Sequence, residues 1–397
     1  MAPSTPRSIM PYYRSVGDIP RKRHTQFRQP DGSLFTEELM GEEGFSFDSS
    51  LMYHTYPPTA LKAIEPVEAE DQECAANHPL RPRHFKTHQL KTGGDPVRAR
   101  ALLMANDDCA ISYYVGGDDS DLYKNATGDE MVYVEQGSGT LETVFGAIRF
   151  EPGDYLIIPA SVIHRYIIDK SSEPVRALIL ETRGHLGPPR RYLSRNGQLL
   201  EHAPYCERDL HGPAAPLLHE GSDVEVFVKH RGGVTKFIYE HHPFDVVGWD
   251  GYLYPYKFSI HDFEPITGRI HQPPTVHQTF EAPGVVICSF VPRLFDYHPD
   301  AIPAPYNHAN VDSDEVIFYV DGNFTSRKGS GIEKGSISLH PAGHTHGPQP
   351  GSVEASIGRE GTEELAVMID TFRPLDLGPG ARDSEDDSYA WTWLEGR

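Results

Sequence analysis

The chain has 397 residues, of which 38% are hydrophobic and 10% aromatic, and a formal net charge of −21 at pH 7. This length and composition suit one large or two ordinary globular domains, and they exclude a chain that is disordered throughout. The strong negative charge argues against nucleic acid and anionic membrane as partners, because repulsion would oppose their approach.

The N-terminal segment MAPSTPRSIMPYYRS lacks the apolar core of a secretory signal, and no uninterrupted apolar stretch has transmembrane length. We therefore expect a cytoplasmic protein. The four cysteines are scattered without any C-x-x-C spacing, which supports neither a disulfide framework nor a zinc knuckle. We expect them to be small buried apolar side chains; they are Cys74, Cys109, Cys206 and Cys288.

Short runs rich in Val, Ile, Phe and Tyr, separated by proline and glycine, predict a mainly β fold. Residues 96–105 (PVRARALLMA) suggest a short helix. Few long segments keep the helical period, so we expect helices only at the periphery. The predicted strands are, in chain order, residues 131–134, 155–158, 285–291 and 316–320.

An internal repeat gives the clearest architectural signal. NATGDEMVYVEQG at residues 125–137 aligns without gaps with NVDSDEVIFYVDG at residues 310–322. A second pair follows at nearly the same distance, GDYLIIPASVIH at residues 153–164 and GSISLHPAGHTH at residues 335–346. Matched blocks in the same order indicate two copies of one β unit.

Each copy contains Gly, five residues, Pro and, five positions after that Pro, His, and this arrangement resembles the motifs of the cupin superfamily. The resemblance implies small antiparallel jelly-roll barrels. We therefore expect an all-β bicupin, with two double-stranded β-helix barrels and few peripheral helices. In this hypothesis residues 1–235 form an N-terminal β domain with a degenerate, metal-free cupin, and residues 236–397 form a C-terminal catalytic cupin with the iron site.

The second copy carries a candidate metal site made of His308, Glu315 and His346. Because side chains alternate across a strand, all three can point into one barrel. Two imidazoles and one carboxylate on one face of a metal leave positions open, which suits ferrous iron that binds substrate and oxygen. Asp314 would point to the opposite face, and Glu315 keeps the six-residue spacing to Gly322.

The first copy has Tyr123 where the second has His308, while Glu130 and His164 remain. Two ligands rarely hold catalytic iron, so we predict a structural first barrel in which Glu130 and His164 are hydrogen-bonded pocket residues. In the second copy, His344 is expected to be a solvated turn histidine at the rim.

Over most of its length the sequence is similar to homogentisate 1,2-dioxygenases, most strongly in the C-terminal third. The resemblance implies an Fe²⁺-dependent dioxygenase that opens the ring of homogentisate with O2 to give maleylacetoacetate, in tyrosine and phenylalanine catabolism. It also implies a homo-oligomer, a trimer or hexamer. The phrases that carry it are KRHTQFR (22–28), VVGWDGYLYPYKF (246–258), PYNHAN (305–310), LHPAGHTHGP (339–348) and VMIDTFRPL (367–375).

The same resemblance implies roles for single residues. The family's iron ligands fall on His308, Glu315 and His346. Asn310 and His340 would orient substrate and oxygen by hydrogen bonds. The catalytic base falls on His271, with His277 as the alternative.

The sequence departs from the family at two points, an extra residue between His308 and Glu315 and Phe324 where a pocket tyrosine is expected. A relative acting on gentisate, hydroquinone or a substituted homogentisate would keep the same iron chemistry. Two further hypotheses are a non-catalytic metal-binding bicupin and an isomerase-type or hydrolytic cupin that uses zinc or manganese.

The C-terminal segment combines an acidic stretch at residues 382–387 with Trp391 and Trp393. We expect the acidic stretch to be solvated, and the two tryptophans are candidates for docking on a neighbouring subunit.

Overall fold

The computed structural model describes residues 13–68, 72–90, 93–170 and 173–394. Most of the N-terminal segment considered above, residues 1–12, lies outside these ranges. Within the described residues the fold is almost entirely β, as predicted, and the α-helices are two short ones, α1 (Ser352–Ser356) and α2 (Pro379–Ser384). No described helix has the length and apolar character needed to cross a membrane.

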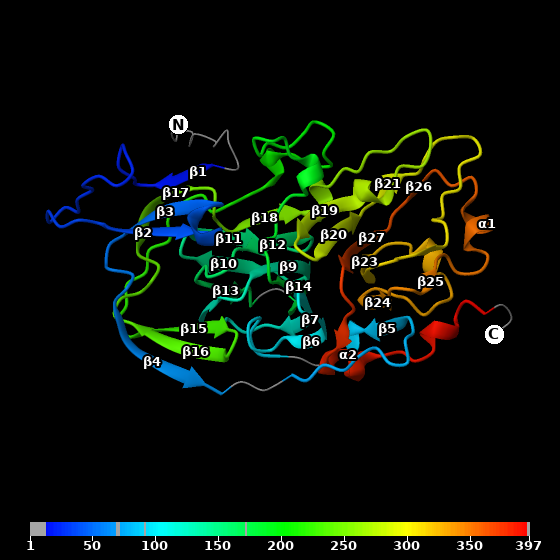
Figure 1. Ribbon diagram of the computed structural model, residues 1–397, viewed down its shortest axis with the longest axis horizontal. Coiled ribbons are helices and arrows are strands. Elements are labelled where there is room, and N and C mark those ends of the chain that lie inside the picture. Colours follow the sequence, from blue (N-terminus) through cyan, green and yellow to red (C-terminus); the bar gives the residue numbers. More distant parts are fainter. Residues whose placement is uncertain (1–12, 69–71, 91–92, 171–172, 395–397) are drawn as a thin grey trace.

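Three large sheets make up the body of the molecule (Figure 1). The first has the order β11 (Gly146–Phe150), β10 (Gly139–Thr143), β13 (His164–Ile168), β8 (Leu122–Asn125), β15 (Val224–His230), β16 (Gly233–Tyr239) and β4 (Leu61–Val67). The second has the order β18 (Tyr256–Ser259), β12 (Asp154–Ile158), β9 (Asp129–Gln136), β14 (Val175–Thr182), β7 (Cys109–Gly116), β6 (Ala101–Ala105) and β28 (Asp376–Leu377). The third has the order β19 (Gln278–Ala282), β20 (Val285–Phe290), β27 (Leu365–Thr371), β23 (Asp314–Asp321), β24 (Ser336–His340) and β5 (Arg83–Lys86).

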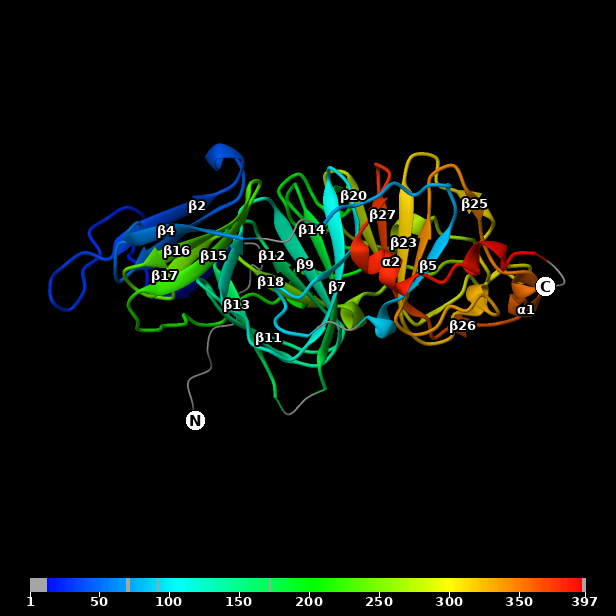
Figure 2. The same cartoon turned by 90° about the horizontal axis from the view of Figure 1, so that it is seen from below.

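Smaller elements complete the two ends of the molecule. Figure 2 shows β2 and β4 at one end of the long axis and α1, β25 and β26 at the other. A four-stranded sheet has the order β1 (Arg14–Gly17), β17 (Val246–Gly251), β3 (Ser49–His54) and β2 (Thr36–Gly41). Two-stranded sheets pair β21 (Arg293–Leu294) with β26 (Gly361–Thr362), and β22 (His308–Ala309) with β25 (Thr345–His346). The short 3-10 helices are η1 (Glu43–Phe45), η2 (Thr87–Gln89), η3 (Arg190–Tyr192), η4 (Glu207–Asp209), η5 (Ile260–Asp262), η6 (Pro274–His277), η7 (Thr325–Arg327) and η8 (Tyr389–Trp391).

The strand order reproduces the internal repeat. Strands β12-β9-β14-β7-β6 of the second sheet correspond in order to β24-β23-β27-β20-β19 of the third. The facing strands correspond as well, because His164 lies opposite Tyr123 in the first copy and His346 lies opposite His308 in the second. Two copies of one antiparallel unit are therefore present, and the bicupin architecture follows from this topology.

The two units exchange strands at equivalent edges. β18 extends the first copy beside β12, and β5 extends the second copy beside β24. β16 runs across residues 235 and 236. The proposed domain boundary between residues 235 and 236 therefore falls inside a strand and remains a proposal. Each half of the chain also supplies a strand to a sheet of the other half.

The second and third sheets pack face to face through aromatic side chains. Tyr113 and Tyr133 contact Phe318 edge-on, with ring centroids 5.9 and 6.2 Å apart. Because side chains alternate along a strand, Phe318 on β23 packs between the sheets while Ile317 and Tyr319 belong to a separate cluster inside the second barrel. One face of β23 therefore builds the core and the other is available for a site.

The four predicted strands are all present, as parts of β9, β12, β20 and β23. The helix predicted at residues 96–105 was wrong. Residues 96–98 form a turn and Ala101–Ala105 is strand β6, paired with β7 and β28. Partners on both sides in the sheet override the helix propensity of Ala, Leu and Met.

All four cysteines are unpaired, as expected, but only Cys109 and Cys288 are buried, whereas Cys74 and Cys206 are partly exposed. The acidic stretch at residues 382–387 is not simply solvated. Glu385 accepts hydrogen bonds from Arg81 and Arg83 at 3.0 and 2.5 Å, and Asp386 lies 2.8 Å from Lys86 Nζ. These pairs hold the C-terminal segment against β5.

Candidate metal centre

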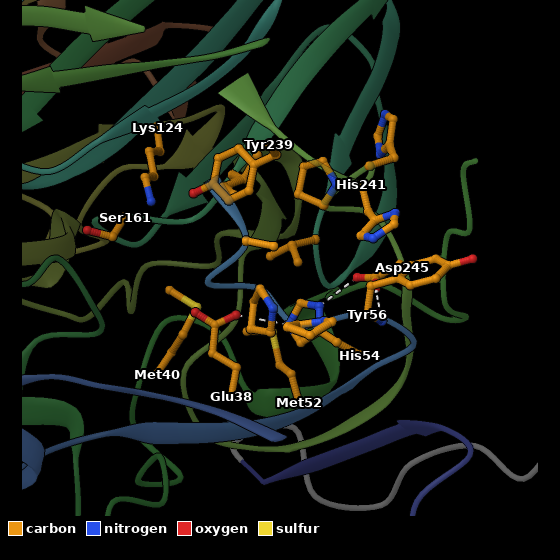
Figure 3. Close-up of a pocket in the computed structure, with 17 residues that line it drawn as sticks. Glu38, Met40, Met52, His54, Tyr56, Lys124, Ser161, Tyr239, His241 and Asp245 are labelled. Carbon is orange, nitrogen blue, oxygen red and sulfur yellow. Dashed lines mark hydrogen bonds and ion pairs between the residues drawn. The ribbon is translucent and has the colours of Figure 1, made fainter. Parts of the chain in front are cut away.

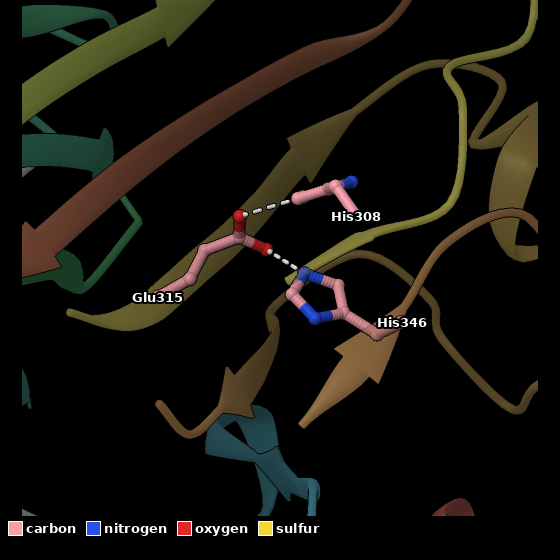
Figure 4. A group of neighbouring side chains, drawn as sticks. All are labelled: His308, Glu315 and His346. Atoms are coloured by element: carbon pink, nitrogen blue, oxygen red, sulfur yellow. Dashed lines mark hydrogen bonds and ion pairs between the residues drawn. The ribbon is translucent and has the colours of Figure 1, made fainter. Parts of the chain in front are cut away.

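His308, Glu315 and His346 converge on one face of the second barrel (Figure 4). His308 on β22 and His346 on β25 are directly opposite each other in an antiparallel pair, and Glu315 comes from the neighbouring strand β23. Glu315 Oε1 lies 3.2 Å from His346 Nε2, and Glu315 Oε2 lies 3.5 Å from His308 Nε2. One potential ligand atom from each residue lies within 4.8 Å of the other two.

Backbone carbonyls orient both imidazoles. His308 Nδ1 donates to the Tyr306 carbonyl and His346 Nδ1 donates to the His344 carbonyl, each at 3.1 Å. A neutral imidazole that donates from Nδ1 presents the lone pair of Nε2, the form in which histidine binds a metal. With Glu315, the donor set is two imidazole nitrogens and one carboxylate, and it fits a divalent transition metal.

The two adjacent carboxylates have different functions. Asp314 accepts hydrogen bonds from the backbone N–H groups of Ala342 and Leu375, both at 2.8 Å. It therefore fixes the loop after β24 and the segment after β27. Glu315 faces the histidines, as the alternation of a strand requires.

His340 lies directly behind the group of three. It is fully buried at the end of β24, opposite Glu315 in the strand register. Its Nδ1 donates to Glu315 Oε1 at 2.8 Å, so its Nε2 accepts from the hydroxyl of Tyr389 at 2.9 Å. Its ring also stacks on His346 with centroids 4.1 Å apart. His340 therefore holds both Glu315 and His346 in place.

The electrostatics of this cluster keep Glu315 ionised and His340 neutral. Burial by itself raises the pKa of Glu315, but the contacts with His308, His340 and His346 outweigh it and hold the pKa well below its usual value. Burial lowers the pKa of His340 to about 3, against the opposing effect of its hydrogen bond to Glu315. A carboxylate that stays charged and accepts several hydrogen bonds is suited to metal binding.

A cavity of about 1000 Å³ adjoins the metal ligands, and His308 and Glu315 form part of its wall. Both candidate base residues also line it. His271 is 56% exposed, and its Nδ1 lies 3.4 Å from Asp296 Oδ2. Burial lowers the pKa of His277 to about 3, and its Nδ1 has no hydrogen-bond partner among the described residues.

Asn310 is not brought into this cavity. Strand β22 ends at Ala309, and Asn310 belongs to the following turn, where its carbonyl accepts from Gly343 N–H at 3.2 Å. His344 also stays outside the cavity wall, and its main-chain carbonyl orients His346. Phe324 packs edge-on against Tyr319, with centroids 5.0 Å apart.

The first barrel holds an internal cation of its own. The Arg100 guanidinium lies 2.8 Å from Glu130 and 3.1 Å from Glu181. Glu130 also accepts hydrogen bonds from Tyr123 and Asn125 at 3.1 and 3.0 Å. His164 Nδ1 donates to the Val162 carbonyl, while its Nε2 is buried without a partner among the described residues.

Two further polar sites lie in the N-terminal half. One is a pocket of about 50 Å³ in which His54 contacts Asp245 at 2.6 Å and Glu38 at 2.9 Å. Figure 3 shows these three side chains together. Elsewhere Glu42, Asp129 and His185 form a second group with metal-ligand side chains, but Asp129 already accepts two backbone N–H groups.

Sequence reasoning missed two side chains close to the candidate centre. Tyr389 comes from the C-terminal segment, and Arg327 follows β23 in η7 and lines the cavity. No local sequence pattern marks Tyr389. For Arg327 an indirect signal exists, because strand alternation from Glu315 places Tyr319 on the inner face, and Tyr319 accepts a hydrogen bond from Arg327. Trp393 packs on Tyr389 of its own chain, with centroids 5.1 Å apart, and Trp391 is 56% exposed.

Residues 51–260 match the family model described as homogentisate 1,2-dioxygenase N-terminal. The chain belongs to the homogentisate 1,2-dioxygenase family. A Saccharolobus solfataricus protein named "Putative dioxygenase" is 40% identical over 388 residues, which cover 97% of this chain and 99% of that protein.

Homogentisate 1,2-dioxygenases of Bradyrhizobium diazoefficiens and Emericella nidulans are 29% and 28% identical, over 69% and 68% of this chain. The matches cover 63% and 60% of the length of those two family members. Among solved structures, a cupin barrel protein of Leptotrichia buccalis covers 78% of this chain and all of its own, at 11% identity and a TM-score of 0.32. The fold assignment rests on the strand topology of this chain itself.

Proposed function

We propose that this protein is an Fe²⁺-dependent ring-cleaving dioxygenase that opens homogentisate with O2 to give maleylacetoacetate. The observation that carries the proposal is the group His308, Glu315 and His346, which adjoins a large cavity in a member of this family. A structural metal would favour a closed set of protein ligands, whereas three ligands next to a cavity leave room for a substrate. This favours an enzyme over a metal-storing bicupin.

The residues that would hold iron are His308, Glu315 and His346, through two Nε2 atoms and the carboxylate. When bound, ferrous iron would supply open coordination positions and the redox chemistry that oxygen activation needs. Zinc offers no redox chemistry, and the isomerase or hydrolase hypothesis predicts activity with zinc or manganese. The metal dependence of activity therefore separates these two classes.

The chain's own groups would orient and deprotonate the substrate. His271 is the candidate base for a ring hydroxyl, because it lines the cavity and its Nδ1 faces Asp296. His277, with its pKa lowered to about 3, is the weaker base. His340 would keep Glu315 in position and does not itself line the cavity.

The reaction is balanced without any further reductant. The bond between the ring carbon that bears the acetate side chain and its hydroxylated neighbour breaks, and both atoms of O2 enter the product. Gentisate, hydroquinone or a substituted homogentisate are the alternative substrates of the same site. From family membership we also propose a homo-oligomer, a trimer or hexamer.

The test begins with protein purified without oxygen, loaded with Fe²⁺ and mixed with homogentisate. Oxygen uptake and the ultraviolet absorbance of maleylacetoacetate are followed together, and we expect one O2 consumed for each homogentisate. His308→Ala should abolish both signals and reduce bound iron. The matched control is His164→Gln, which changes the equivalent of His346 in the first barrel and should leave iron binding unchanged.

Iron binding without oxygen uptake on homogentisate would move the substrate to the gentisate or hydroquinone class. Absence of iron binding in the wild-type protein would contradict the proposal, and so would activity that depends on zinc or manganese in place of iron.

A further inference from the structure

Arg327 is the most deeply buried arginine of the cavity wall. It ends the 3-10 helix η7, lines the cavity together with His308 and Glu315, and is only 7% exposed. A buried charge is costly unless it is paired and hydrogen-bonded. The surroundings of this guanidinium therefore indicate what it binds.

Two hydrogen bonds fix the guanidinium within the protein. Its Nε donates to the Tyr319 hydroxyl at 3.0 Å, and its Nη1 donates to the Gly347 carbonyl at 2.5 Å. Its central carbon lies 6.0 Å from the centroid of the Trp393 ring. These contacts hold the planar group in one orientation, and guanidinium groups held in this way suit bidentate recognition of a carboxylate.

No described carboxylate forms an ion pair with this cation, and the charges of Glu315 and Glu364 act on it only from a longer distance. Among the described residues, its hydrogen bonds are those of Nε to Tyr319 and Nη1 to Gly347, and neither acceptor is a carboxylate. The comparison with Arg100 in the first barrel is direct, because that buried arginine contacts both Glu130 and Glu181. The same side chain is thus charge-paired in the structural barrel and unpaired in the cavity of the second barrel.

The other arginines of the cavity wall differ from Arg327. Arg293 Nη2 lies 4.0 Å from Glu364, and its Nη1 donates to the Val291 carbonyl. Arg359 is exposed, and its Nε donates to the Ala355 carbonyl. Arg327 alone of the three is both deeply buried and without a carboxylate of its own.

We infer that Arg327 is a specificity-determining residue that binds the carboxylate of the aromatic acid substrate. The inference rests on the proposed function and sharpens it, because an uncharged hydroquinone would leave the guanidinium unpaired. It predicts an arylacetate or a similar aromatic acid, in preference to a neutral dihydroxybenzene.

A competing role follows from the hydrogen bond to the Gly347 carbonyl, since Gly347 comes directly after His346. In that role Arg327 would only brace a metal ligand. If Arg327 only braces the ligand, its replacement should weaken the binding of acidic and neutral ligands alike. If it binds the substrate carboxylate, replacement should weaken the binding of the acids alone. The test must therefore compare two ligands that differ only in charge.

The first measurement is calorimetric binding of phenylacetate and of phenylacetamide to the wild-type protein. We expect phenylacetate to bind at least tenfold more tightly. Arg327→Gln should remove this difference, and Arg327→Lys should restore part of it because the positive charge remains. Arg359→Gln, in the same cavity wall, should keep the difference and serves as the matched control.

Turnover gives the second measurement. For Arg327→Gln, we expect the KM for homogentisate to rise 10- to 100-fold, with little change for its methyl ester and with iron content unchanged. Equal binding of phenylacetate and phenylacetamide by the wild-type protein would overturn the inference without any variant. Equal weakening of both ligands in the two Arg327 variants would also overturn it and assign Arg327 to bracing. The binding measurement decides the inference even if no turnover occurs, so its failure is distinct from that of the proposed function.

Discussion

At the scale of single residues, histidine has different roles at different positions around the candidate site. His340 is buried, neutral and hydrogen-bonded on both ring nitrogens, so it can position its neighbours but cannot accept a proton from substrate. His271 is half exposed beside Asp296, and His277 is partly buried and packs against Phe290 with ring centroids 4.9 Å apart. Surroundings, and not residue type, decide which histidine can take part in proton transfer.

This contrast predicts different effects for the two cavity histidines. His271→Ala should lower kcat for homogentisate by about 100-fold or more, the usual contribution of a general base. Because His271 is exposed, the variant should bind iron and unfold like the wild-type protein. His277→Ala is the control. It should lower stability through lost packing and change kcat by less, and the reverse order of effects on kcat would assign the base to His277.

At the scale of elements, the two copies of the repeat each bury a charged glutamate, and different side chains face it in each copy. Strands β9 and β23 each bring a buried glutamate to the inner face of a barrel, Glu130 in one and Glu315 in the other. In the first copy Arg100 neutralises the glutamate, and in the second copy two histidines and a candidate metal site face it. The first barrel has Tyr123, in place of a histidine, opposite His164, and its buried carboxylate is paired with an arginine.

Arg100→Met should therefore destabilise the protein by about 3 to 5 kcal/mol in urea unfolding, because Glu130 would be left as a buried unpaired charge. Adding Glu130→Gln should restore much of that loss, because the charge itself is then removed. Arg149→Met breaks an exposed ion pair with Asp169 and should cost no more than about 1 kcal/mol. Similar costs for Arg100→Met and Arg149→Met would contradict an internal cation in the first barrel.

At the scale of the whole molecule, buried histidines limit stability at both ends of the pH range. Burial by itself lowers the pKa of His54, but hydrogen bonds to Asp245 and Glu38 outweigh it and raise the pKa to about 9. Protonated His54 therefore stabilises the folded protein. This contribution is fully present below a pH of about 6.5, the pKa of the histidine in the unfolded chain, and is lost as the pH rises through 9. Burial lowers the pKa of His84 and of His242 to about 4, so stability also falls as the pH drops from about 6.5 towards 4.

His54→Gln should therefore lower the free energy of unfolding, relative to the wild-type protein, most near pH 6.5 and little above about pH 9. The loss at the two pH values should differ by up to about 3 kcal/mol. Urea unfolding of the variant and of the wild-type protein across this range measures that difference. His241→Gln changes another histidine of the same pocket, which forms no ion pair with a described carboxylate, and is the matched control. A constant difference for His54→Gln would contradict the charged state of His54.

The sequence by itself determined the features that depend on local periodicity. The repeat at residues 125–137 and 310–322 predicted two equivalent β units, because identical spacing of apolar, acidic and glycine residues produces the same strand and turn. Alternation along a strand also separated Asp314 from Glu315, and the resemblance to the cupin motifs marked His308 and His346. The three proposed metal ligands could therefore be named before the structure was known.

Only the tertiary structure decided what surrounds those ligands. Tyr389 reaches His340 from the C-terminus, and Arg100 reaches Glu130 from the segment just before β6. Strands β5 and β18 each complete a sheet of the other copy. Contacts between segments far apart in the chain leave no periodic signal in either segment. The same reason explains the wrong helix at residues 96–105 and the unpredicted place of Arg327 in the cavity wall, since both depend on partners that only the folded chain brings together.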